Sequence, residues 1–141
     1  MTAPGSVWMP VGLARSMTVV DAFMLLFWGV TALAAMQVLR LPPDALYKGY
    51  DQPLLVAWNW SSMPIVVAFA LTGLAAVRQS RTDRPWHGLA LILLTLTMCA
   101  GAMAIGFWAV FGDFNPGWWL PNLVMLLGPL IWLPGIARRA R

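Results

Sequence analysis

The segment GLALILLTLTMCAGAMAIGFWAVF, residues 88–111, decides the fold, because it contains no charged residue and no polar face. Similar apolar blocks occur elsewhere, and we place the full set at about residues 18–39, 54–77, 88–111 and 118–137. A helix of about 20 apolar residues crosses a hydrocarbon core about 30 Å thick and satisfies its own backbone there. No block alternates like a strand. The sequence therefore predicts four transmembrane helices.

A soluble bundle is the alternative fold, and the blocks exclude it. Helices of a soluble bundle carry a polar face opposite the apolar stripe, which these blocks lack. The composition agrees, with 60% hydrophobic and 10% charged residues, a mean hydropathy of +0.73 and no glutamate. The first block is too long for the apolar region of a signal peptide, so we expect it to be retained. We predict one domain over residues 1–141, an all-α integral membrane protein with an antiparallel four-helix bundle.

Basic residues predict the orientation, because Lys and Arg are enriched in cytoplasmic loops. The side with most of them carries Arg15, Arg78, Arg81, Arg84, Arg138, Arg139 and Arg141. The other side has only Arg40 and Lys48. Both termini are therefore predicted to be cytoplasmic, in a multi-pass protein of the inner (plasma) membrane. These cations lie at membrane edges, where they contact anionic lipid headgroups, so the net charge of +4 does not indicate nucleic-acid binding.

Cysteine and histidine are too few for a metal site. Cys99 lies alone in the third block, so an intrachain disulfide is impossible. The single histidine, His87, follows Trp86 in a loop, and the chain has no Gly-rich phosphate loop and no Ser-His-Asp order. We therefore expect no metal and no cofactor.

Aromatic and polar residues gather toward the predicted external side. Asn59 lies between two tryptophans inside the second block, and Asn122 lies at a similar depth in the fourth. A buried amide needs a hydrogen-bond partner. Either the two amides bond across the helices, or they form the polar base of an aromatic ligand pocket. The candidate ligand-binding residues are Tyr50, Asp51, Trp58, Asn59, Trp60, Trp108, Trp118, Trp119 and Asn122.

Asp21 is the only acid inside a predicted block, and intramembrane acids often mark proton or ion sites. A helix that starts near Ser16 or Thr18 places Asp21 in its first turn, whereas a start at Pro10 places it about three turns deep. We favour the shallow position. If the protein is an enzyme, the candidate catalytic acids are Asp21, Asp51 and Asp113.

Several motifs carry a resemblance to a known family. They are YKGYDQP (47–53), AWNWS (57–61), AIGFW (104–108), DF (113–114) and WWLPNL (118–123). Over roughly residues 21–133 the chain resembles the YvaD family of small bacterial four-span membrane proteins. The resemblance implies four spans in a bacterial plasma membrane, and it implies no activity.

Three functions stay open at this point. The first is binding of a hydrophobic small molecule or lipid in the aromatic pocket. The second is an intramembrane isomerase or cyclase that uses an aspartate as general acid. The third is a small dimeric transporter, because small residues such as Ala100 and Ala104 would let helices of two copies approach. The expected partners are membrane lipids, a hydrophobic ligand and a second copy of the chain.

Overall fold

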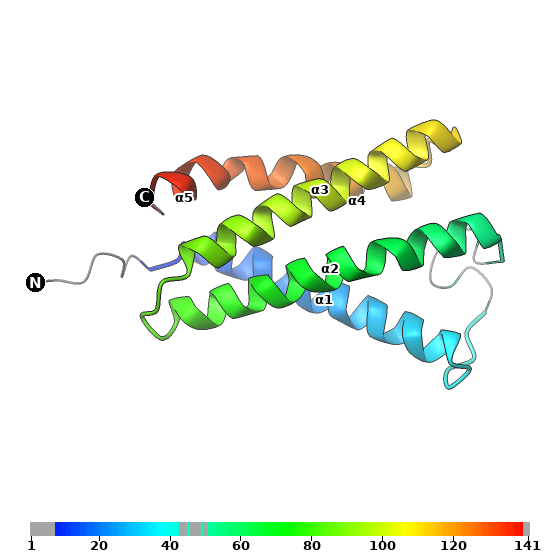
Figure 1. Cartoon of the computed structure of the whole chain (residues 1–141), viewed down its shortest axis with the longest axis horizontal. Coiled ribbons are helices and arrows are strands. Elements are labelled where there is room, and N and C mark those ends of the chain that lie inside the picture. The colour runs from blue at the N-terminus through cyan, green and yellow to red at the C-terminus, as the bar shows by residue number, and fades with distance from the viewer. Residues whose placement is uncertain (1–7, 43–44, 46–48, 50, 140–141) are drawn as a thin grey trace, which may run out of the picture.

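The protein is all-helical in the part that the computed structural model describes, residues 8–42, 45, 49 and 51–139. The helices are α1 (Val11–Ala35), α2 (Pro53–Ser80), α3 (His87–Phe111), α4 (Pro116–Leu127), the 3₁₀ helix η1 (Gly128–Ile131) and α5 (Leu133–Arg139). In these ranges four helical segments are long and apolar enough to span a membrane: α1, α2, α3 and the combined Pro116–Arg139. The predicted four-span helical bundle is confirmed. The start of α1 and the end of α5 lie at one end of it, the terminal end (Figure 1).

Helix α1 begins at Val11 rather than near Ser16 or Thr18, and this changes the depth of Asp21. The Ser16 and Thr18 hydroxyls donate to the carbonyl oxygens of Leu13 (2.9 Å) and Ala14 (2.8 Å). Hydroxyls bonded in this way sit inside a helix instead of capping it. The shallow position favoured for Asp21 is therefore wrong. Asp21 lies about 15 Å beyond the start of α1 and is 1% exposed.

The other spans follow the predicted boundaries more closely. Helix α2 passes through Pro64 without ending and extends to Ser80, beyond the predicted end at residue 77. Helix α3 agrees within one residue at each end. The fourth span is interrupted, because Pro129 opens the 3₁₀ turn between α4 and α5. Proline lacks a backbone donor, which interrupts the α-helical hydrogen bonds at this point.

Each span packs against the span next to it in the sequence. Helix α1 packs on α2, α2 on α3, and α3 on α4, η1 and α5. Within the described residues, no Cα atom of α1 lies within 8 Å of one in α3 or α4. Figure 1 shows α1 and α4 diverging away from the terminal end. The backbones of the first and last spans therefore lie apart in the half away from the termini.

Side chains close the terminal end of this gap. A Cβ atom on Gly12 of α1 would lie 3.7 Å from the indole of Trp132, in the fourth span. The main apolar core begins there, with Leu13, Trp86 and Ile136 buried together, and it continues to the middle of the bundle. A smaller core around Leu55, Ala104 and Trp108 holds the opposite end.

The closest backbone approach shown by the glycines is that of α4 to α3 at Gly101. A Cβ atom on Gly101 would lie 2.7 Å from the backbone nitrogen of Leu126 and 2.8 Å from the carbonyl oxygen of Asn122. Helices in a bilayer gain little from hydrophobic burial, so they associate through small residues that allow such contact. Gly101 therefore fixes how near Asn122 comes to α3.

Replacing Gly101 with alanine should separate α3 from α4 and destabilise the protein by about 1–3 kcal/mol, since backbone atoms cannot move aside as a side chain can. The measurement is thermal unfolding of the purified protein in detergent, followed by tryptophan fluorescence. Gly106→Ala is the matched control on the same helix, because a Cβ atom there meets nothing within 4 Å. Equal unfolding temperatures for the two variants would contradict the packing described.

Candidate functional site

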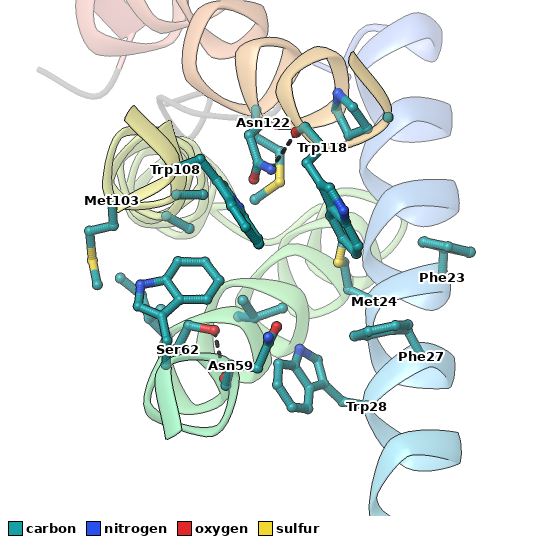
Figure 2. A pocket seen from close by; sticks show the side chains of 18 of the residues that line it. Phe23, Met24, Phe27, Trp28, Asn59, Ser62, Met103, Trp108, Trp118 and Asn122 are labelled. Atoms are coloured by element: carbon teal, nitrogen blue, oxygen red, sulfur yellow. Dashed lines mark hydrogen bonds between the residues drawn. The ribbon is translucent and has the colours of Figure 1, made fainter. Parts of the chain in front are cut away.

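A cavity of about 460 Å³ lies between the four spans, in the half of the bundle away from the termini. Figure 2 shows Trp28 of α1, Asn59 and Ser62 of α2, Trp108 of α3, and Trp118 and Asn122 of α4 around a common space. The cavity follows from the packing order, because no Cα atom of α1 lies within 8 Å of one in α4.

Stacked aromatic rings form its walls. Trp108 stacks on Trp118 with ring centroids 5.9 Å apart, which joins α3 to α4. Trp58 stacks on Phe107 at 4.4 Å, which joins α2 to α3. Such pairs contribute about 0.5–1.5 kcal/mol each beyond their buried area. The walls therefore gain stability from ring contacts, and they present indole faces and edges to the cavity.

Two amides and a hydroxyl supply the polar groups. The side-chain nitrogen of Asn59 donates to the carbonyl oxygen of Leu55 (2.9 Å), and that of Asn122 donates to the carbonyl oxygen of Trp118 (2.7 Å). The Ser62 hydroxyl donates to the carbonyl oxygen of Asn59 (2.7 Å). Each asparagine thus bonds within its own helix, and the bond between the two amides is not formed. Each amide oxygen keeps its lone pairs for another donor.

The cavity reaches the lateral surface of the bundle. Two of its lining side chains, Phe23 of α1 and Met103 of α3, are 60% and 50% exposed. Both helices cross the hydrocarbon region, so these side chains face lipid rather than water. A molecule dissolved in the membrane therefore has access from the side.

The structure brings five of the predicted ligand-binding residues to this cavity: Trp58, Asn59, Trp108, Trp118 and Asn122. Three others lie elsewhere. Trp60 packs edge-on against Trp28 with centroids 5.8 Å apart, Trp119 stacks on Phe114 at 5.3 Å, and Asp51 is exposed just before α2. Tyr50 lies outside the described residues.

Sequence reasoning missed the contribution of α1. Met24, Phe27 and Trp28 line the cavity from this helix, and Trp28 is 6% exposed. A tryptophan in the middle of a span lies away from the headgroup region that tryptophan usually prefers. Its position is therefore the sequence signal that could have placed Trp28 in an interior site.

The candidate acid Asp113 has a structural role in the turn before α4. Its carboxylate accepts the backbone N–H of Asn115 (3.1 Å), and the Asn115 side chain in turn accepts the N–H of Gly117 at the helix start (2.8 Å). The indole of Trp119 donates to the Asp113 carbonyl oxygen (2.8 Å). These bonds satisfy backbone donors at the start of α4, as helix caps do.

Asp21 forms a separate buried feature, closer to the terminal end than the cavity. Its carboxyl lies directly against Gly73 of α2, and a Cβ atom on Gly73 would collide with it. The Oδ2 atom is buried with no hydrogen-bond partner among the described residues. Leu93 of α3 closes the same contact, since its side chain lies 3.1 Å from that Cβ position. Asp21 is thus a buried acid within a span, packed where α1, α2 and α3 meet.

Fold and cavity together define a multi-pass, all-helical membrane protein with an aromatic cavity between its spans. The chain belongs to the family of unknown function DUF5360, which matches residues 13–141. It is 36% identical over 102 residues to the uncharacterized protein YvaD of Bacillus subtilis (strain 168), covering 72% of this chain and 77% of that protein. The predicted family membership is confirmed. No solved structure matches the fold.

Substitution of Gly73 by alanine should lower the thermal stability of the protein in detergent, and removal of the Asp21 carboxyl should restore most of the loss. The reason is that the new methyl group and the carboxyl compete for one space. A double-mutant cycle of Gly73→Ala and Asp21→Ala measures this, with an expected coupling of about 1–3 kcal/mol. Additive effects of the two substitutions would show that the residues do not touch.

Proposed function

We propose that this protein binds an uncharged hydrophobic small molecule or lipid in the aromatic cavity, in the plasma membrane of a bacterium and with both termini in the cytoplasm. The cavity carries the proposal. Its volume of about 460 Å³ lies within the range of about 300–1,000 Å³ typical of ligand pockets. A dry space of this size leaves the lining side chains without partner atoms on one side, so an occupant would gain those contacts.

The lining chemistry favours an uncharged ligand with one hydrogen-bond donor. No Asp, Glu, Lys, Arg or His is among the described residues that line the cavity. The free amide oxygens of Asn59 and Asn122 accept from a hydroxyl or N–H group. The indole faces suit a ring or an unsaturated chain through contact area. A ligand of this kind enters from the bilayer past Phe23 or Met103.

Filling the cavity tests the proposal. Ala104 of α3 is 4% exposed and lines the cavity, so Ala104→Phe places a ring in the ligand space. The probe is N-phenyl-1-naphthylamine, a neutral aromatic amine with one N–H, detected by energy transfer from tryptophan in detergent solution. We expect the variant to bind this probe at least about tenfold more weakly than the unmodified protein, a loss of about 1.4 kcal/mol.

Ala102→Phe is the matched control, because Ala102 is exposed on the same helix and does not line the cavity. The control should bind the probe like the unmodified protein. Molecules extracted from each purified protein and identified by mass spectrometry give a second readout, which should lose a species only in Ala104→Phe. If both variants bind the probe and retain co-purifying molecules alike, the cavity is not the binding site.

The lining of the cavity supports an enzymatic function less well than it supports ligand binding. None of Asp21, Asp51 and Asp113 is among the residues lining the cavity. A general acid must come within hydrogen-bond distance of its substrate. A molecule held in the cavity therefore has no carboxyl group beside it in this arrangement of the described residues.

A second candidate function is proton-coupled transport, and the burial of Asp21 favours it. The residue lies near the middle of α1, is 1% exposed, has no ion-pair partner among the described residues and packs against Gly73, with Leu93 beside the contact. An isolated charge in such a place is costly, and intramembrane acids of this kind often belong to proton pathways. We infer that Asp21 exchanges a proton during any such transport cycle.

Proton flux in proteoliposomes tests this second function. A potassium gradient and valinomycin impose a membrane potential on vesicles that contain pyranine. Acidification of the vesicle interior is measured by the fluorescence of pyranine. The unmodified protein should acidify vesicles faster than lipid alone, and Asp21→Asn should return the rate to that of lipid alone. Asp51→Asn is the control, since Asp51 is exposed outside the spans. Flux that survives in Asp21→Asn would remove the residue from this role.

A further inference from the structure

A second hollow lies at the terminal end of the bundle, on the outside of α1 and α2. It has a volume of about 380 Å³, and its walls come from the chain just before α1, the first turns of α1 and the end of α2. Figure 1 shows the start of α1 and the end of α2 at the same end of the molecule. We call this hollow the arginine groove, because Arg15 and Arg81 both line it.

The arginine groove combines two cations with an apolar wall. Its remaining lining residues are Trp8, Met9, Val11, Ala14, Thr18, Val19 and Ser80, none of which is acidic. Trp8 is 73% exposed and Val19 is 69% exposed, so the wall lies open along the side of the bundle. The two guanidinium groups have no ion-pair partner among the described residues. The groove therefore presents positive charge that nothing in the described chain neutralises.

The depth of Arg15 in the membrane indicates which anion its guanidinium group can bind. The early start of α1 places Arg15 inside the first span rather than before it, one turn beyond Val11. An arginine one turn inside a span extends its head toward the headgroup region, where phosphate oxygens are the abundant anions. Val11 and Val19 lie about 12 Å apart along the same helix, so the apolar wall runs from headgroup depth toward the hydrocarbon.

We propose that the arginine groove is a specific binding site for one anionic phospholipid. The lipid phosphate lies between Arg15 and Arg81, each of which can offer paired N–H donors to its oxygens. The Ser80 hydroxyl donates to the carbonyl oxygen of Val77 (2.8 Å) and keeps lone pairs for a headgroup hydroxyl. One acyl chain lies along Val11, Thr18 and Val19. This site is independent of the aromatic cavity, with which it shares no lining residue.

The chain offers a matched control for general surface charge. Arg78 and Arg84 are exposed, lie on the same side of the membrane as Arg81 and do not line the groove. The pair Arg15→Gln with Arg81→Gln therefore removes the same charge as the pair Arg78→Gln with Arg84→Gln. If the lipid binds at one defined site, only the Arg15 and Arg81 pair of substitutions weakens binding. If the surface charge attracts anionic lipid diffusely, both pairs weaken binding equally.

The experiment titrates each purified protein in detergent with phosphatidylglycerol or with phosphatidylcholine of the same acyl chains. Bound lipid is counted by native mass spectrometry. For the unmodified protein we expect saturable binding of one phosphatidylglycerol molecule and weaker binding of phosphatidylcholine. The Arg15 and Arg81 double variant should bind phosphatidylglycerol at least about tenfold more weakly, because charge-assisted hydrogen bonds are lost. The Arg78 and Arg84 double variant should bind within about twofold of the unmodified protein.

Three results would overturn the proposal. One is equal weakening in both double variants, and another is equal binding of the two lipids by the unmodified protein. The third is competition by free glycerol phosphate at the concentrations at which the lipid binds, which would mean that the acyl chain does not contribute. All four substituted arginines are exposed, so each variant should unfold at the temperature of the unmodified protein when no lipid is added.

Discussion

Apolar solvent around the spans is the constraint on which the rest of the structure depends. Inside a bilayer the backbone must bond to itself, which allows only helices here, and burial of leucine against leucine gains little over burial in lipid. Helices then come together where small residues permit close contact. Gly101 allows α4 to approach α3, and the missing side chain of Gly73 leaves room for the carboxyl group of Asp21 from α1.

The same constraint explains why the bundle contains a space. Backbone contacts run from each span to its neighbour in the sequence, and α1 meets the fourth span at Trp132, near the terminal end. At the other end, the indole of Trp58 in α2 packs edge-on against Trp108 in α3, and Trp108 stacks on Trp118 in α4, so these rings join the three helices. The rings are rigid and cannot spread to fill the gap toward α1. The result is a cavity with aromatic walls, amide groups and access from the lipid.

Much of this arrangement could be predicted from the sequence, because length and apolarity alone determine the spans. The four spans and the positions of Asn59 and Asn122, each the seventh residue of its helix, follow from counting along the chain. The start of α1 could not be predicted in this way, since Ser16 and Thr18 resemble capping residues but bond inside the helix.

Which tryptophans face the cavity depends on rotation about the helix. Trp58 and Trp60 are about 200° apart, so only one of them could line it. The burial of Asp21 against Gly73 depends on a contact between two helices that sequence patterns do not contain.

The most direct test of the central claim is a crystal structure of the protein grown in a lipid mesophase, in which the cavity between the spans can be inspected. We expect continuous non-protein density between Asn59 of α2 and Asn122 of α4, with Trp108 and Trp118 against it. A map in which α1 and α4 close together and side chains fill that space would contradict it.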